Sequence, residues 1–156
     1  MTLSTADRLA LSDLVHRYAA GADDRHFDSV ARLFTDNAEL AVPDPPTVLE
    51  PVHVHRGQRA IAVAVASVGA LERTEHAIVG EVYDQDAHSG IASGRIACVA
   101  HHWTRRDEQA DDLVWHVRYR DEYRLMDAGW RIHRRALTVD AIETRAVRRV
   151  RPPDPA

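Results

Sequence analysis

The order of the elements along the chain predicts an α+β fold, in which a cone-shaped, curled antiparallel sheet is closed by N-terminal helices. Segments with helical spacing come first, and four long segments rich in β-branched and aromatic residues follow. This order is typical of α+β domains. Strands well above the usual length of about five or six residues must twist and curl when they share one sheet. A curled sheet covered by helices leaves a pocket at its wide end, so the fold class itself predicts a small-molecule site.

Two helices are expected at the start of the chain. Ser4 offers a hydroxyl cap and Asp7 an acid in the first turn, and both favour a helix N-terminus. Apolar residues then recur at helical spacing, at Leu11, Leu14, Val15, Tyr18 and Ala22. Gly21 weakens the helix near its end. A second apolar stripe predicts a two-turn helix over residues 27–34.

The next segment combines a strand, a loop and a helix. A short alternating strand is expected at residues 38–42, and a proline-rich loop at 43–55 that holds an extended piece at 52–55. A third helix is expected from Gly57 to about Leu71. Its high content of Ala, Val and Ile predicts that it is buried on most sides.

Four strand segments complete the fold, at residues 75–84, 90–104, 113–126 and 129–142. Turn-forming residues separate them at 84–89, 107–112 and 127–129. No linker divides the chain, so we expect a single domain over residues 1–142. Residues 143–156 are rich in arginine and proline and are expected to form a C-terminal tail.

Composition excludes several classes of function. A chain of 156 residues with 45% apolar residues is the size of one globular domain. The net charge of −4 gives no general attraction to nucleic acid or to an anionic membrane. No apolar run approaches the length of about 18 residues that a membrane span needs, so we expect a soluble, cytoplasmic protein. The single cysteine, Cys98, excludes an intramolecular disulfide, and the absence of lysine excludes Schiff-base chemistry and a P-loop lysine.

The stretch from Tyr18 to Asp28 marks the chain reversal between the first two helices. It places a tyrosine and a carboxylate, Tyr18 and Asp23, five residues apart, where side chains can turn into a cavity. Residue types alone also fit a helix end with solvated acids, because charged groups are mostly exposed. Helical periodicity does not choose between Asp23 and its neighbour Asp24.

Three stretches carry a resemblance to a known family: YAAGADDRHFDSVARLF at 18–34, Thr74-Glu75-His76, and YRDEYRLMDAGWRIHRR at 119–135. On these stretches the chain resembles the SnoaL-like branch of the nuclear transport factor 2-like (NTF2-like) superfamily. The resemblance implies a cystatin-like α+β cone or barrel. It leaves the reaction open, because that fold carries dehydratases, isomerases, cyclases, epoxide hydrolases and proteins that only bind ligands.

Within the superfamily the chain is most similar to scytalone dehydratase, bile acid 7α-dehydratase and the lindane dehydrochlorinase. Those enzymes use an aspartate at the end of the first helical region and a histidine early in the first long strand. The resemblance places these two roles on Asp23 and His76, and a tyrosine shortly before the aspartate matches Tyr18. A second histidine or an arginine from the later strands often completes such sites, and His116 and Arg135 are the candidates.

The predicted chemistry is proton transfer by a His–Asp pair, with no cofactor and no metal. A neutral imidazole can take up a proton near neutral pH, and a carboxylate on its other ring nitrogen fixes the tautomer and stabilises the imidazolium. Tyr18, Tyr119 or an arginine could donate to a leaving group or an enolate. We therefore expect a dehydratase, or a related elimination, on a hydrophobic cyclic substrate. A polyketide-type cyclase or isomerase of the same fold, and a non-catalytic ligand-binding or assembly module, stay open as alternatives.

Alternation within residues 114–119 predicts which side chains line the pocket. If Trp115 and Tyr119 face the pocket as substrate-binding residues, strict alternation turns His116 away from it, and a bulge would reverse this. The histidine pairs of the chain do not predict a metal site, because neither has partners at a spacing that requires one. These pairs are His53 with His55, and His101 with His102.

Copies of the chain itself are the expected protein partners. An open sheet with an arginine-rich face would leave a large surface exposed, and proteins of the family that the chain resembles commonly cover it by forming homo-oligomers. The arginines are Arg118, Arg120 and Arg124. Dimer and trimer both stay open, and no nucleic-acid or membrane partner is expected.

Overall fold

The computed structural model describes residues 2–86 and 88–155. The helices are α1 (Thr5–Asp23), α2 (Phe27–Ala31), α3 (Gln58–Val65) and a short 3-10 helix, η1 (Ala66–Ala70). The strands are β1 (Phe34–Asp44), β2 (Val48–Arg56), β3 (Arg73–Gln85), β4 (Ala92–Arg106), β5 (Gln109–Met126) and β6 (Gly129–Val147). The expected turn at 84–89 includes Ala87, which lies outside the described residues.

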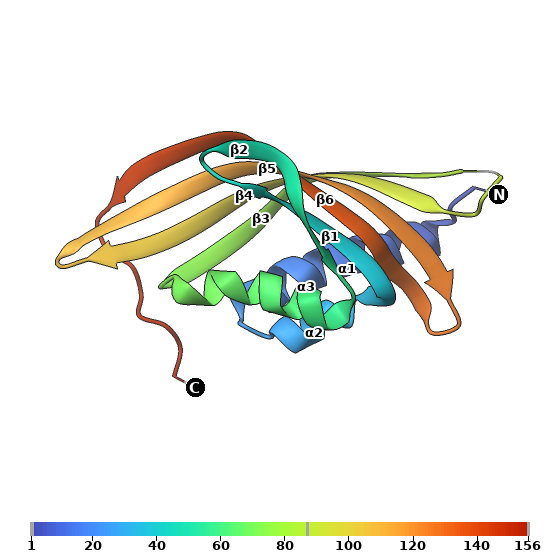
Figure 1. Cartoon of the computed structure of the whole chain (residues 1–156), viewed down its shortest axis with the longest axis horizontal. Helices are drawn as coiled ribbons and strands as arrows, with labels where there is room; N and C mark the ends of the chain where they lie inside the picture. Colours follow the sequence, from blue (N-terminus) through green and yellow to red (C-terminus); the bar gives the residue numbers. More distant parts are fainter. Residues whose placement is uncertain (1, 87, 156) are drawn as a thin grey trace.

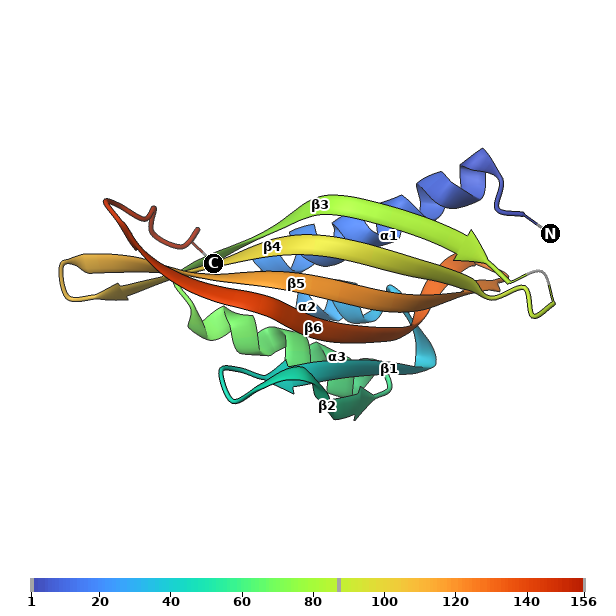
Figure 2. The same ribbon diagram turned by 90° about the horizontal axis from the view of Figure 1, so that it is seen from above.

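All six strands form one curled sheet in the order β2-β1-β6-β5-β4-β3. Figure 1 shows this sheet arching over the helices, and Figure 2 shows the strands side by side in the same order. The sheet is unclosed, with β2 and β3 at its edges. The predicted α+β class, with N-terminal helices and a curled sheet, is therefore confirmed.

The sheet is mixed, whereas the sequence predicted an antiparallel one. Neighbouring strands are antiparallel except β1 and β6, which run parallel. The consecutive hairpins from β3 to β6 fix the direction of β6. The chain leaves α2 beside the N-terminal part of β6, where Phe34 pairs with Ile132. The first strand, β1, therefore enters the sheet next to β6 and runs in the same direction.

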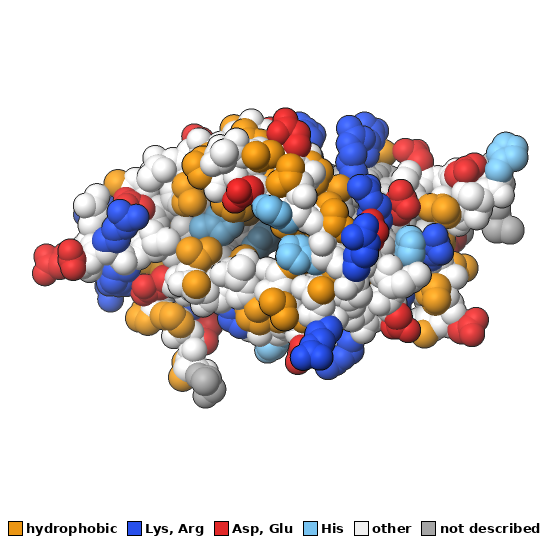
Figure 3. All heavy atoms as spheres, in the orientation of Figure 1, with side chains coloured by type: hydrophobic (Ala, Val, Ile, Leu, Met, Phe, Trp, Pro, Cys, Tyr) orange, Lys and Arg blue, Asp and Glu red, His pale blue; other side chains and the backbone are white. Residues whose placement is uncertain are grey.

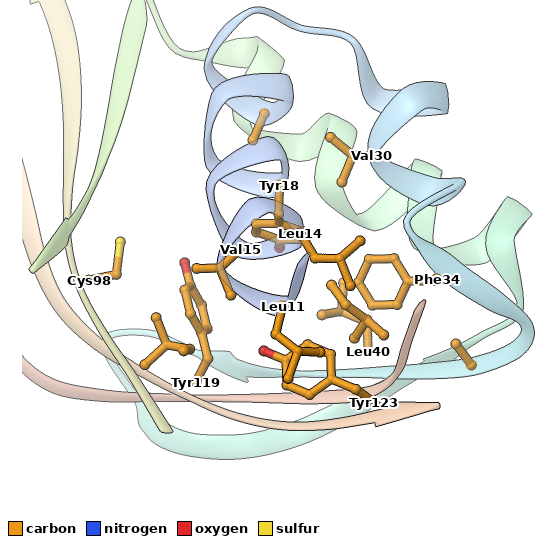
Figure 4. Close-up of a cluster of buried hydrophobic side chains, with 14 of the residues drawn as sticks. Leu11, Leu14, Val15, Tyr18, Val30, Phe34, Leu40, Cys98, Tyr119 and Tyr123 are labelled. Carbon is orange, nitrogen blue, oxygen red and sulfur yellow. The ribbon is translucent and has the colours of Figure 1, made fainter. Parts of the chain in front are cut away.

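Helix α1 packs across the concave face of the sheet. Ser4 caps it, because its hydroxyl accepts from the Asp7 backbone and the Asp7 carboxylate accepts from the Ser4 backbone in return. The indole Nε1 of Trp130 in β6 also donates to Asp7, at 2.9 Å. The apolar stripe predicted from the sequence is buried against the sheet, as Figure 4 shows for Leu11, Leu14 and Val15.

The segment after α2 differs most from the sequence prediction. The prolines hide a hairpin, in which Leu40 of β1 pairs with His55 of β2 and the register shifts between Val42 and Asp44. The third helix is also not buried on most sides, since only Ile61 and Val65 of α3 are buried and Val63 is 70% exposed. Alanine and valine at solvent positions do not produce burial, so composition alone misled here.

The sheet extends beyond the expected domain boundary at residue 142, because β6 continues to Val147. The segment after β6 returns onto the molecule, where Arg105 donates to the carbonyl of Val150 at 3.0 Å and Arg73 to that of Pro152 at 3.0 Å. In the part of the chain that the structure describes, no helix has the length and apolar character of a membrane span. The three arginines expected on an open face, at positions 118, 120 and 124, are exposed.

Aromatic side chains pack over the strands β3 to β5, where the rings of Tyr83 and Tyr123 meet edge to face with centroids 6.0 Å apart. The Tyr123 ring lies over Gly94, and a Cβ atom at Gly94 would come within 2.9 Å of the Tyr123 ring and its hydroxyl oxygen. Tyr123 cannot shift easily, because it is buried and its hydroxyl donates to Asp121 at 2.6 Å. Glycine at position 94 therefore makes room for the Tyr123 ring.

We expect Gly94→Ala to lower the free energy of unfolding by about 1–3 kcal/mol, because overpacking forces neighbouring side chains to shift. The matched control is Gly80→Ala in β3, where the added Cβ would meet only Ala97 at an ordinary 3.8 Å. That change should be neutral or slightly stabilising, because alanine restricts the unfolded chain more than glycine does. Urea unfolding of both variants measures the difference, and equal effects at the two positions would contradict this packing.

Candidate active site

A cavity of about 300 Å³ lies between the concave face of the sheet, α1, α3 and the β1–β2 hairpin. Figure 3 shows the hollow on this face, with histidine side chains within it. Most of the walls are apolar. The polar residues among its lining are Tyr18, His55, Ser67, His76, His102 and Tyr119.

Asp23 and His76 form a hydrogen-bonded pair beside this cavity. Asp23 is the last residue of α1, and His76 lies near the start of β3. The His76 Nδ1 atom is 2.6 Å from Asp23 Oδ1, and the His76 backbone N–H donates to Asp23 Oδ2 at 2.8 Å. Because the carboxylate occupies Nδ1, the other ring nitrogen, Nε2, is the one that can act on a ligand. The His76 side chain lines the cavity and is 10% exposed.

Two further residues hold the pair in place. The Thr74 hydroxyl donates to Asp23 Oδ1 at 2.9 Å and accepts from Arg25 Nη1 at 2.8 Å. Arg25 also donates to the carbonyl of Leu71 at 3.1 Å, which ties the turn after α1 to the start of β3. Arg25 itself has a φ of 64°, an uncommon conformation for a residue other than glycine. The tight turn directs Asp23 toward β3 and leaves Asp24 exposed.

The hydrogen bonds of Asp23 decide its charge. Burial raises the pKa of this carboxyl, but the hydrogen bonds from His76 and Thr74 and the attraction to His76 outweigh burial and hold the pKa below its usual value. Asp23 is therefore a carboxylate at neutral pH. An ionised partner at Nδ1 is the arrangement that makes an imidazole an effective base at Nε2.

Of the candidate site residues, Tyr18, Tyr119 and Trp115 line the cavity, and Arg135 does not. The rings of Tyr18 and Tyr119 meet edge to face, with centroids 6.0 Å apart. The Arg135 guanidinium lies behind them and is fully buried. It forms two hydrogen bonds with Asp121, from Nε at 2.9 Å and from Nη2 at 2.6 Å. Direct contact between Arg135 and a ligand in the cavity is not available in this arrangement.

His116 lies on the opposite face of the sheet. Trp115, Val117 and Tyr119 line the cavity, so alternation along β5 holds through this stretch. The bulge at this point leaves His116 opposite Ala141 and Val117 opposite Val139, so the extra residue belongs to β6 and β5 keeps its alternation. His116 instead pairs with Glu143, with Nε2 and Oε2 2.6 Å apart. We therefore leave His116 out of the proposed site.

His102 is a cavity residue that the sequence prediction missed. Its ring lies 6.1 Å from that of His76 and 4.6 Å from that of Trp115. Its Nδ1 lies 2.8 Å from the Leu113 carbonyl, which can only accept, so Nδ1 carries the proton. Burial lowers the pKa of His102, which keeps the ring neutral. Alternation along β4, with Ala100 facing inward, was the signal that could have found it.

The two neighbouring histidines of β4 point to opposite faces, so their rings do not converge on one site. His101 lies on the outer face and pairs with Asp112, with Nδ1 and Oδ2 2.6 Å apart. Within residues 2–86 and 88–155, no three His, Cys, Asp or Glu side chains gather in an arrangement that could hold a metal ion.

Solved structures of similar fold include three informative ones. A type 2 hexachlorocyclohexane dehydrochlorinase (LinA) shares 17% identity over 95% of each chain, with a TM-score of 0.75. A candidate scytalone dehydratase from Novosphingobium aromaticivorans shares 20% identity over 96% of this chain and 93% of that one, with a TM-score of 0.73. The Kfla4162 protein from Kribbella flavida shares 26% identity over 88% of this chain and 93% of that one, with a TM-score of 0.72.

These similarities establish the fold and leave the reaction open, and the comparison with curated protein sequences gave no match. The family model is more specific. The model of the SnoaL-like domain matches residues 4–136, which include α1 with Asp23, the start of β3 with His76, and most of the sheet. The resemblance predicted from the sequence is thereby confirmed, and the chain belongs to the SnoaL-like domain family.

Proposed function

We propose that the protein is a cofactor-independent lyase of the dehydratase type, which removes a proton from a hydrophobic cyclic substrate with His76 as the base. The observation that carries this proposal is the Asp23–His76 hydrogen bond of 2.6 Å at the wall of an apolar cavity. The pair leaves Nε2 of a cavity-lining imidazole as the group that can accept a proton. The cavity volume of about 300 Å³ suits a molecule of one or two rings.

In the proposed reaction, His76 Nε2 takes a proton from a carbon next to a carbonyl group. The electron pair of the broken C–H bond moves to the carbonyl oxygen and forms an enolate. The electron pair on the enolate oxygen then re-forms the carbonyl group, a double bond forms between the α and β carbons, and the hydroxyl on the β carbon leaves. The imidazolium returns its proton to this hydroxyl, so that water and an unsaturated ketone are released. Asp23 stays ionised and stabilises the imidazolium in between.

The other polar groups of the cavity fit this sequence. The hydroxyls of Tyr18 and Tyr119 can donate to the enolate oxygen, where negative charge develops. Nε2 of the neutral His102, beside His76, can accept from the O–H of the substrate hydroxyl and orient it, while the proton for its departure comes from His76. The dehydrochlorinase and the candidate scytalone dehydratase of similar fold support an elimination. An isomerase or a cyclase would begin with the same proton abstraction. Only the departure of the leaving group distinguishes a lyase from them.

Hydrogen exchange tests the proton abstraction without knowledge of the natural substrate. Wild-type protein should catalyse deuterium incorporation next to the carbonyl of small cyclic ketones, such as cyclohexanone and β-tetralone, in D2O, as followed by NMR. We expect His76→Gln to lower the rate by about 10²–10⁴-fold, the usual contribution of a general base. Asp23→Asn should lower it as well, because an amide does not stabilise the imidazolium.

The matched control is Asp24→Asn, which removes the adjacent exposed carboxylate and should leave the exchange rate unchanged. The β-hydroxylated form of a ketone that exchanges should then be converted to the conjugated enone, as followed by ultraviolet absorbance. Exchange that survives in both His76→Gln and Asp23→Asn would remove the pair from the chemistry. Exchange without enone formation would favour an isomerase or cyclase over a lyase.

The lowered pKa of Asp23 also predicts a pH dependence of stability. The folded protein binds this proton less tightly than the unfolded chain, whose carboxyl has the usual pKa near 3.8. The stabilising contribution of Asp23 is therefore fully present above that value and is lost as the pH falls through the lower folded pKa. We expect the difference in free energy of unfolding between wild type and Asp23→Asn to shrink between about pH 5 and pH 2 in urea titrations. A difference that grows on acidification would contradict the hydrogen bonding of Asp23.

A further inference from the structure

Arg135 is the one buried arginine in the part of the chain that the structure describes, and it lies directly behind the two cavity tyrosines. Its guanidinium carbon lies 4.2 Å from the centroid of the Tyr18 ring and 4.3 Å from that of the Tyr119 ring. The side chain is 0% exposed. A cation therefore contacts both aromatic rings, although no cationic arginine lines the cavity.

The charge of Arg135 is held in a fixed direction. Asp121 accepts from its Nε and Nη2 atoms, and Tyr123 donates to the same carboxylate at 2.6 Å. Arg135 Nη1 has no hydrogen-bond partner among the described residues. The ion pair is thus neutral overall, but its positive half contacts the tyrosine rings and its negative half is occupied by Arg135 and Tyr123.

The four tyrosines of the chain divide into two pairs by what their hydroxyls do. Tyr83 donates to Glu81 at 2.7 Å and Tyr123 donates to Asp121 at 2.6 Å. Tyr18 and Tyr119 donate to no protein oxygen within the described part of the chain, and both line the cavity. Figure 4 shows Tyr119 reaching from the sheet toward α1, which carries Tyr18. The Tyr119 hydroxyl interacts with the Cys98 thiol, which is a weak acceptor. The two tyrosines without an oxygen acceptor are therefore the two that Arg135 contacts.

We propose that Arg135 is a positioning residue that acts through the rings of Tyr18 and Tyr119, and that it gives this end of the cavity a preference for a negatively charged oxygen. The ligand class is therefore a ring compound whose oxygen is an enolate or a phenolate. The inference deepens the proposed function, on which its importance for catalysis rests. The proposed affinity of the cavity for an oxyanion can be measured with any ligand that binds there, whether or not the protein turns it over.

The electrostatics support this role in two ways. A guanidinium within about 6 Å of an aromatic face is attracted to it, by about 2 kcal/mol or more where water is excluded. The same positive charge draws electron density from the ring and makes the phenolic hydroxyl a stronger donor. Arginine is suited to this because it keeps its charge even when it is buried. Burial raises the pKa of Tyr18 and of Tyr119, so both hydroxyls stay protonated and can donate.

The test uses para-nitrophenol, whose phenolate form is read from its absorbance, and nitrobenzene as its neutral counterpart. It is carried out in His76→Gln protein, so that no imidazolium at position 76 contributes. An apolar cavity without an oxyanion site would raise the pKa of a bound phenol. We predict the opposite, that bound para-nitrophenol ionises at a lower pH than free para-nitrophenol. A raised pKa, or binding of nitrobenzene without binding of the phenolate, would overturn the proposal.

The role of Arg135 itself is tested by removing the ion pair as a unit, in Arg135→Met/Asp121→Asn, because removal of one partner would leave a buried charge. The ratio of affinities for phenolate and phenol should fall about tenfold, which corresponds to about 1.4 kcal/mol, while nitrobenzene binding is kept. The matched control is Arg118→Met/Asp140→Asn, which removes an exposed ion pair on the outer face and should leave the ratio unchanged.

An unchanged ratio in Arg135→Met/Asp121→Asn would also overturn the proposal. If that variant does not fold, the pKa of bound para-nitrophenol in the His76→Gln protein still decides between an oxyanion site and a plain apolar cavity. The single changes Tyr18→Phe and Tyr119→Phe should each raise that pKa, because each removes a donor. The binding experiment includes no turnover. A lowered phenol pKa together with absent hydrogen exchange would contradict the lyase and leave the role of Arg135 intact.

Discussion

The carboxylate of Asp23 joins the two halves of the molecule. It ends α1 and accepts three hydrogen bonds from β3, from the Thr74 hydroxyl, the His76 backbone and the His76 ring. The first helix is thereby fixed to the edge of the sheet, at the point where the cavity begins. The same contacts keep Asp23 ionised and leave only Nε2 of His76 available to a ligand. The same hydrogen bonds therefore fix α1 to the sheet and hold His76 as a base, so a displacement of α1 would disturb both.

The concave face has a second polar centre, and the two are complementary. Near α1 and β3, a carboxylate and an imidazole can hold a proton and its positive charge. Beside Tyr18 and Tyr119, whose rings Arg135 contacts from behind, lies the proposed site for a negative oxygen. The rest of the cavity lining is mostly apolar and includes Leu40 and Val117. A neutral ring compound that bridges these centres would have its C–H bond polarised in the direction in which the proton is removed.

Local sequence patterns predicted most of the helices and strands, but they could not predict which residues pair across the sheet. The capped apolar stripe of α1 and the four long strands follow from spacing. Alternation left the direction of His116 conditional on that of Trp115, and the structure places this site candidate on the opposite face of the sheet. The hairpin of β1 and β2 was hidden because prolines mimic a loop. The contact of Arg135 with Asp121 depends on the register of β5 and β6, which no local pattern specifies. His102 was missed because it was considered with its neighbour His101 as a metal-binding pair, although alternation separates them. Asp23 was preferred to Asp24 through family resemblance, and in the structure Asp23 accepts hydrogen bonds from β3 while Asp24 is exposed.

The tautomer of the neutral His76 ring tests the central claim most directly, because the proposed proton abstraction requires a bare Nε2 toward the cavity. Nitrogen-15 NMR of histidine-labelled protein distinguishes a protonated from a bare ring nitrogen. The structure predicts a proton on Nδ1, held by Asp23, and a bare Nε2, and it predicts that Asp23→Asn disturbs this state while Asp24→Asn does not. A proton on Nε2 in the neutral ring, or a tautomer that is indifferent to Asp23→Asn, would contradict the account.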